Sequence, residues 1–213
     1  MGKAVIPKSS DKTRAEILRA ALKRFANAGY AATSVQQIAV DAKVSKPALY
    51  YHFRDKSDLF TALVNEAVDE RYDLMQKAAA SAKDIRSQLV AVMSALFDYF
   101  HKNHDLTRLA FLSAFAAPGE MPHGRDNLDK CQRNFNAIHS LFRQAVARRE
   151  LDDRFGAEEL AYGFYGLGHF YIVSQLKMPH YRLDRRAAAR IVDLFLAGAA
   201  KKPKIKQANK SKK

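Results

Sequence analysis

Apolar residues recur every three or four positions through most of the chain, which is the spacing of an amphipathic helix. This pattern predicts a first helix from about Lys12 to Ala28, with a Thr13-x-x-Glu16 capping box at its start and Gly29 as its stop. No segment shows the two-residue alternation, bounded by turn residues, that is typical of a strand. The pattern therefore indicates an all-α fold.

Residues 33–60 carry the densest set of helix signals and predict two short helices followed by the start of a third. Ser34 and Gln37 form an S-x-x-Q capping box for the first of these helices. Ser45 is the predicted N-cap of the second helix, and Pro47 falls in its first turn, where a missing N–H removes no helical bond. Two short helices joined by a tight turn are typical of a helix-turn-helix.

The outward face of the second short helix differs from an ordinary solvated face, which would carry Glu, Lys and Gln. It holds one cation, small groups and aromatic rings with polar tips, namely Lys46, Pro47, Ala48, Tyr50, Tyr51 and His52. Small and polar groups at the start of a recognition helix can approach base edges, and Tyr hydroxyls can donate to phosphate oxygens. This face favours DNA binding over the alternative of an ordinary helical hairpin.

These residues resemble the N-terminal domain of the TetR family of transcriptional regulators. The resemblance covers about residues 11–63, and its most specific part is the run Leu49-Tyr50-Tyr51-His52-Phe53 with Lys56 behind it. One departure is Lys43, because the family usually has Gly in this turn. If the position keeps φ > 0, a side chain there costs on the order of 1 kcal/mol.

The resemblance implies roles for the matching positions in this sequence. The candidates for base-edge contact are Gln36, Lys46, Pro47 and Ala48, and the candidates for phosphate contact are Ser34, Tyr50, Tyr51, His52 and Lys56. Lys56 follows the predicted N-cap Asp55, so the positive end of the next helix would support phosphate binding there. The implied function is a ligand-responsive homodimeric repressor that a small apolar inducer releases from a palindromic double-stranded DNA operator.

The formal net charge of +14 is confined to the two ends of the chain. Residues 1–60 hold 11 basic and 5 acidic residues, residues 201–213 hold 7 lysines and no acid, and residues 61–200 sum to +1. A basic head fits contact with a polyanion. Residues 1–10 and 201–213 lack apolar periodicity, so we expect a flexible arm and a disordered tail, each either adding phosphate contacts or having no role.

The composition, 48% hydrophobic and 27% charged, is that of a globular chain. We expect a helix-turn-helix domain over residues 11–60 and a helical ligand-binding and dimerisation domain over residues 61–200. The single cysteine, Cys131, excludes an internal disulfide and suits a reducing cytoplasm. We expect a cytoplasmic location without membrane association, because the sequence has no apolar signal segment and no run as long as a membrane span.

Aromatic and histidine residues are concentrated in the middle of the chain. The resemblance implies an inducer cavity between these helices, with candidate residues Met93, Phe97, Phe100, Phe111, Phe115, Phe135, His139, Tyr165 and His169. Taken one at a time, such residues more often belong to an ordinary core. Acidic residues are scarce on the apolar faces, so we expect a neutral or anionic, largely apolar ligand.

The last two predicted helices, about Ala157–Lys177 and Asp184–Ala200, lie where the family forms its dimer interface. The candidate interface residues are Gly163, Gly166, Ile191, Leu194 and Phe195. Glycines lower helix propensity unless close approach compensates, and that approach could equally occur within one subunit. A two-fold symmetric pair of heads would match a palindromic operator.

The sequence contains no catalytic motif, neither G-x-S-x-G nor G-x-x-x-x-G-K-[ST] nor a dinucleotide fingerprint. His101 and His104 have metal-like spacing, but they straddle a predicted helix end without a Cys or Glu at ligand spacing. We therefore expect a protein that is not an enzyme and uses no cofactor or metal. Two other classes stay open, a sequence-tolerant architectural DNA-binding protein and a small-molecule carrier on the same fold.

Overall fold

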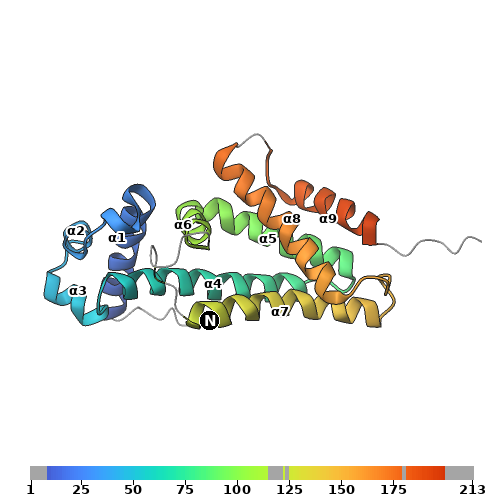
Figure 1. Ribbon diagram of the computed structural model, residues 1–213, viewed down its shortest axis with the longest axis horizontal. Coiled ribbons are helices and arrows are strands. Elements are labelled where there is room, and N and C mark those ends of the chain that lie inside the picture. Colours follow the sequence, from blue (N-terminus) through green and yellow to red (C-terminus); the bar gives the residue numbers. More distant parts are fainter. Residues whose placement is uncertain (1–8, 115–121, 123–124, 179–180, 200–213) are drawn as a thin grey trace, which may run out of the picture.

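The computed structural model describes residues 9–114, 122, 125–178 and 181–199, and every regular element within those ranges is a helix (Figure 1). This confirms the all-α prediction. The helices are α1 (Ser9–Ala32), α2 (Val35–Asp41), α3 (Lys46–His52), α4 (Lys56–Ala80), α5 (Ile85–Lys102), α6 (His104–Ala114), α7 (Arg125–Ala147), α8 (Ala157–Lys177) and α9 (Arg185–Ala199).

The first helix differs from its prediction at both ends. It begins at Ser9, so Thr13 and Glu16 lie inside the helix and do not form its N-terminal capping box. Ser9 and Ser10 are helical, which shortens the predicted flexible arm, and residues 1–8 lie outside the described residues. Gly29 interrupts the helix as expected, with φ 81° and ψ 164°, but one more helical turn follows it as far as Ala32.

A first hydrophobic core lies at one end of the molecule, between α1, α2, α3 and the first half of α4 (Figure 1). The rings of Phe25, Tyr30 and Phe60 meet there with centroids 5.3–5.7 Å apart. Leu49 of α3 and Phe53, which directly follows that helix, are also buried in this core. We call these elements the head.

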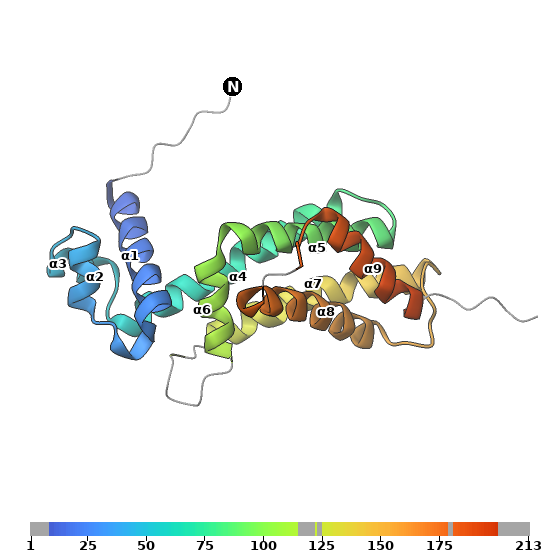
Figure 2. The same ribbon diagram turned by 90° about the horizontal axis from the view of Figure 1, so that it is seen from above.

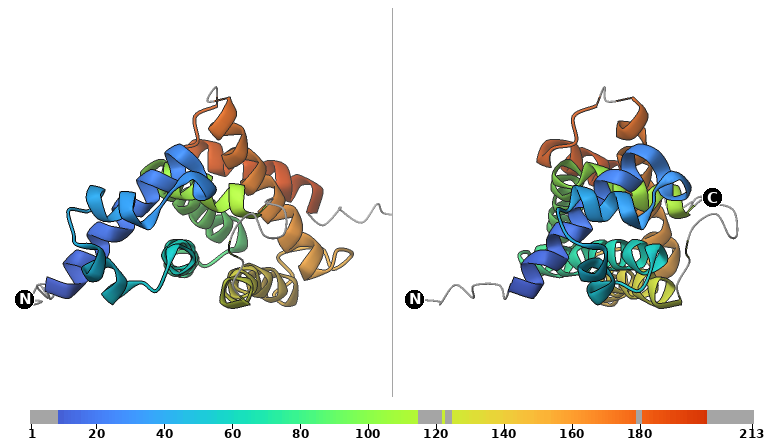
Figure 3. Two further views of the ribbon diagram at one scale, coloured as in Figure 1. Left: turned by 60° about the vertical axis from the view of Figure 1, so that its left-hand side comes forward. Right: turned by 90° about the vertical axis from the view of Figure 1, so that its left-hand side faces the viewer.

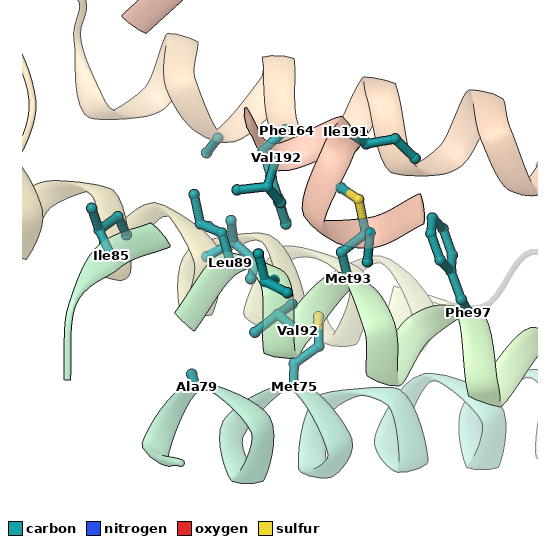
Figure 4. Packing of buried hydrophobic residues seen from close by; sticks show 14 of the residues in the cluster. Met75, Ala79, Ile85, Leu89, Val92, Met93, Phe97, Phe164, Ile191 and Val192 are labelled. Carbon is teal, nitrogen blue, oxygen red and sulfur yellow. The ribbon is translucent and has the colours of Figure 1, made fainter. Parts of the chain in front are cut away.

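The second core lies between the rest of α4 and helices α5 and α7–α9, which we call the body. α5 and α7 each pack along α4, and α8 and α9 cover them from the other side (Figures 1 and 2). Figure 3 shows α4 and α7 almost end-on and side by side. In Figure 4, Phe164 of α8 and Val192 of α9 lie over Leu89 and Val92 of α5.

The head and the body share one continuous helix. Leu59 and Val68 of α4 belong to the head core, whereas Met75 and Ala79 of the same helix belong to the body core. The helix therefore runs through the domain boundary that was predicted at residue 60. A rigid element that enters both cores can carry a displacement from one core to the other.

Candidate functional site

The local signals for the helix-turn-helix are present in the structure as hydrogen bonds. Ser34 Oγ accepts from the Gln37 N–H at 3.3 Å, and Gln37 Oε1 accepts from the Ser34 N–H at 2.9 Å, which is the predicted capping box. Ser45 Oγ accepts from the Ala48 N–H at 3.2 Å, and Pro47 lies in the first turn of α3. These caps fix where both short helices begin.

The turn between α2 and α3 keeps its left-handed residue although that residue is not glycine. Lys43 has a φ of 57°. Its N–H donates to Val40 O at 3.1 Å, and the N–H of Val44 donates to Ala39 O at 3.0 Å. These two bonds form a Schellman motif, the helix ending that glycine usually occupies. The cost expected for a side chain at positive φ therefore applies to Lys43.

The outward face of α3 is exposed in the way the sequence predicted. Lys46, Pro47, Tyr50 and Tyr51 are exposed, and Tyr51 retains 81% of its surface. Lys46 Nζ lies 5.8 Å from the Tyr50 ring centroid, so a cation and an aromatic ring adjoin on this face. We call the exposed residues of α2 and α3 the recognition surface: Ser34, Gln36, Lys46, Pro47, Tyr50 and Tyr51, with Ala48 and His52 partly exposed. Their contacts with DNA stay a prediction.

Lys56 has partners within the head that the sequence did not indicate, because its ammonium group binds carbonyls of α1. Lys56 Nζ donates to Tyr30 O at 2.9 Å and to Ala31 O at 3.3 Å. It also lies 4.4 Å from the centroid of the Tyr30 ring. Carbonyls at the end of a helix lack donors within the helix, and the Lys56 ammonium group donates to two such carbonyls of α1. The Lys56 side chain thus helps to hold the head together, and its contact with phosphate stays a prediction.

The body contains a cavity of about 410 Å³ between α4, α5, α6, α7 and α8. Seven of the predicted pocket residues line it, namely Met93, Phe97, Phe100, Phe111, Phe135, Tyr165 and His169. His139 does not line it, and its ring stacks on Phe135 with centroids 6.3 Å apart. Phe115 lies outside the described residues. That the cavity binds a ligand stays a prediction.

Further polar residues of the cavity wall were not among the predicted pocket residues. Arg71, Tyr99, Thr107 and Asn134 line the cavity, each from a different helix. Arg71 Nε, Thr107 Oγ1 and Asn134 Oδ1 are buried without a hydrogen-bond partner among the described residues. The pattern of charged residues along α4 resembles a solvated face, so the inward position of Arg71 gave no signal in the sequence.

The apolar wall shifts the proton affinities of three cavity residues. Desolvation by the surrounding cavity wall and the charge of Arg71 lower the pKa of His169 to about 4, so its imidazole is neutral at physiological pH. Burial raises the pKa of Tyr165 to about 12, and its hydroxyl contacts Met75 Sδ at 3.5 Å. Burial and the nearby Glu70 carboxylate raise the pKa of Tyr99 to about 12. Arg71 is thus the permanent charge on this wall.

Helix α6 belongs to both the head and the cavity. Leu109 is buried in the head core, and α6 packs against α1. Thr107 and Phe111, two positions to either side of Leu109, line the cavity. A ligand that displaces Phe111 would therefore also displace a residue of the head core.

Two predicted dimer residues have other positions. Ile191 is 2% exposed and packs in the body core, so its assignment to the dimer interface was wrong. Gly166 lines the cavity. The Cβ of any residue replacing Gly163 would lie 3.2 Å from Phe195, so this glycine permits close approach within the subunit. Leu194 is 64% exposed and remains available to a partner.

The histidine pair with metal-like spacing is used within the subunit. His101 Nε2 lies 2.8 Å from Leu183 O, and the His104 ring packs near Phe100 with centroids 5.4 Å apart. No group of three potential metal ligands occurs among the described residues. No described helix has the length and apolarity needed to cross a membrane.

Comparisons with known proteins agree with this geometry. The profile of the family described as bacterial regulatory proteins, tetR family, matches residues 17–63. The HTH-type transcriptional activator FasR of Mycolicibacterium smegmatis is 36% identical over 101 residues, which are 47% of this chain and 46% of FasR. The HTH-type transcriptional repressor SCO4008 of Streptomyces coelicolor is 24% identical over 164 residues, 76% of this chain and 80% of that repressor. The match to FasR thus spans less than half of that relative.

Solved structures share the whole fold. The fatty acid degradation regulator FadR from Bacillus halodurans superposes with a TM-score of 0.79 at 17% identity, covering 91% of this chain and 98% of FadR. FadR from Bacillus subtilis, in complex with stearoyl-CoA, superposes with a TM-score of 0.77 at 17% identity, covering 86% and 98%. At these identities the likeness concerns the fold alone. Residues 17–63 of the head are thus similar to the tetR family of bacterial regulatory proteins.

Proposed function

We propose that the protein is a homodimeric repressor whose two heads bind a palindromic operator and whose cavity binds a small effector that releases it. The observation that carries this proposal is the position of α6, because Leu109 packs in the head core while Phe111 lines the cavity. The exposed aromatic and basic groups of α3 support the DNA-binding half of the proposal.

The mechanism requires that effector and operator prefer different arrangements of the heads. Two recognition helices reach successive major grooves when they are about 34–36 Å apart. An effector that favours a different position of α6 and α4 would change this separation and lower operator affinity. Its power to do so is limited by the difference between its affinities for the two arrangements.

The dimer surface that we propose includes exposed apolar residues of α8 and α9. Phe170 is 72% exposed and Leu194 is 64% exposed, although large apolar side chains are usually covered. Both helices also contact each other within the subunit. In this proposal Phe170 takes the place of the buried Ile191 as an interface residue.

The proposed effector has an apolar body. Five phenylalanines line the cavity together with Met75, Met93 and Ile172: Phe97, Phe100, Phe111, Phe135 and Phe164. The stearoyl-CoA complex of the structurally similar FadR shows that a protein with this fold can hold an acyl compound. An acyl chain is therefore one form that the effector of this protein could take.

Selection of bound sequences from a random pool of duplex DNA, at two salt concentrations, tests the DNA-binding function. We expect enrichment of a palindrome that survives the higher salt. The Lys46→Ala variant should change the preferred sequence, whereas Lys77→Ala, which alters an exposed lysine of α4 away from the recognition surface, should leave it unchanged. DNA recovered without enrichment, and lost steeply as salt rises, would instead indicate a sequence-tolerant architectural protein.

Sedimentation equilibrium tests the dimer. Leu194→Glu should convert the dimer to a monomer, because it would bury a charge in an apolar interface. Leu128→Glu is the matched control, since Leu128 of α7 is 70% exposed and lies outside the proposed surface. A Leu194→Glu protein that remains a dimer would exclude this interface.

A further inference from the structure

Arg71 is a cation on the wall of an apolar cavity without a carboxylate partner. It lines the cavity from α4, and its Nε has no hydrogen-bond partner among the described residues. Within the same part of the chain Arg71 makes no ion pair and lies over no aromatic ring. Leaving a buried charged donor unpaired is unfavourable, so such a group is expected to have a partner that completes it.

The acidic residues next to Arg71 on α4 have other partners. Asp69, two residues earlier, binds both Lys130 and Arg133 from α7. Arg133 also lies 4.2 Å from the Tyr72 ring centroid. Asp69 is thus shared by two other cations. The adjacent Glu70 lies near the hydroxyl of Tyr99 and forms no ion pair with Arg71 among the described residues.

A second unpartnered polar group lines the same cavity. Thr107 of α6 is 7% exposed, and its hydroxyl oxygen has no partner among the described residues. A hydroxyl can donate to an anion as Arg71 can. Asn134 Oδ1 is also unpartnered, but it is an acceptor, so it suits a hydroxyl or water and not a negatively charged oxygen.

The remaining wall excludes a ligand that is charged along its whole length. Phenylalanine and methionine side chains dominate it, and His169 beside Phe111 is uncharged at neutral pH because its pKa is about 4. Arg71 also disfavours a cationic ligand. The fitting shape is therefore one anionic head attached to an apolar body.

We propose that the effector is an organic monoanion, a carboxylate with an apolar body, whose head binds Arg71 and Thr107 while its body lies among the phenylalanines of the cavity. This inference rests on the proposed effector function of the cavity and adds the chemical class of the effector. Arg71 is then the residue that selects anions over neutral compounds of equal length.

Isothermal titration calorimetry of the full chain with three probes of equal length tests this assignment. The probes are decanoate, decanol and decylamine, used below their aggregation concentrations. Decanoate should bind on the order of tenfold or more tightly than decanol, as expected for a charge-assisted hydrogen bond in a dry site, and decylamine should bind most weakly. Equal binding of decanoate and decanol, tighter binding of decylamine, or no binding of any probe would overturn the proposal.

Variants separate a role in selectivity from a role in folding. Arg71→Gln should remove the preference for decanoate and leave decanol binding unchanged, whereas Arg71→Lys should retain part of the preference. Arg143→Gln, which removes an exposed cation of α7 that does not line the cavity, should behave as the wild type. A preference that survives Arg71→Gln would assign anion binding to another basic segment and overturn the proposal.

The outcome is independent of the DNA-binding test. A protein that enriches a palindrome but shows no Arg71-dependent preference would lose this inference and keep its proposed function. A protein that binds decanoate through Arg71 but enriches no DNA sequence would keep the anion site and lose the proposed regulatory role.

Discussion

The head and the body use polar groups in opposite ways. In the head, the polar groups at the element ends are satisfied locally, by Ser34 and Ser45 as helix caps and by Lys56 on the carbonyls of α1. In the body, Arg71 Nε and Thr107 Oγ1 face a cavity without partners among the described residues. These groups of the head are thus satisfied by the chain itself, whereas the cavity wall offers bonds to a molecule from outside.

The two regions therefore differ in how far a ligand can change their arrangement. A fully bonded helix-turn-helix holds its recognition surface in one arrangement, which sequence-specific contact requires. A cavity whose hydrogen-bonding groups lack partners is stabilised when a ligand bonds to them. Its arrangement can therefore depend on the ligand. Helix α6 lies where these two regimes meet, because it contributes residues to both.

Leu109→Ala should have the largest effect on stability, because it removes a buried side chain of α6 from the head core, at the helix that also lines the cavity. We expect the free energy of unfolding to fall by about 2–5 kcal/mol, as for other Leu→Ala changes in cores. Urea denaturation measures it, with Leu128→Ala at an exposed site as the control. A loss below about 1 kcal/mol would mean that α6 is not anchored in the head.

Lys56→Gln should have the next largest effect on stability. The substitution removes a charged donor from two carbonyls of α1 and a cation from the Tyr30 ring, so we expect the free energy of unfolding to fall by about 1–2 kcal/mol. If these intramolecular bonds are the whole role of Lys56, the salt dependence of DNA binding should stay unchanged. If it flattened by about one unit of slope with no loss of stability, Lys56 would be a phosphate contact after all.

Lys43→Gly in the head and Arg149→Gly in the body test the same backbone geometry. Lys43 in the head and Arg149 in the body have φ values of 57° and 61°, and both follow a helix in a Schellman arrangement. Each Gly variant should be more stable by about 0.5–1 kcal/mol in urea denaturation, because glycine relieves left-handed strain. A destabilised Lys43→Gly protein beside a stabilised Arg149→Gly protein would show that the Lys43 side chain makes a contact of its own.

His169→Gln should give the smallest effect, and only below neutral pH. The pKa of His169 is about 4 in the folded protein against 6.5 ordinarily, so between these values the unfolded chain binds a proton that the folded chain does not. Stability supplied by neutral His169 is complete above pH 6.5 and is lost as the pH falls towards 4. The Gln variant should lose less stability over this window, measured by urea denaturation at several pH values; parallel curves would contradict the shift.

The elements of the head could be predicted from the sequence because their signals are local. The helix caps act over three or four residues, so the neighbouring sequence is enough to predict them. They are the Ser34 capping box, the Ser45 cap with Pro47, and the Asp55 cap of α4. The start of α1 escaped prediction, because Thr13 and Glu16 match a capping box by spacing although the helix begins at Ser9. Seven cavity residues could also be named in advance, because the resemblance to the TetR family implied a cavity among the aromatic and histidine residues of these helices.

The partners of the long polar side chains were decided by the tertiary structure. Lys56 contacts Tyr30 and Ala31, which lie 26 and 25 positions away, and Arg71 meets a cavity built from five helices. Helical periodicity likewise placed Ile191 on an apolar stripe, but which neighbour covers that stripe depends on how α9 packs on α5. Local hydrogen bonds and helical periodicity depend on residues that are close in the sequence. The contacts between residues that are far apart in the sequence depend instead on how whole helices pack.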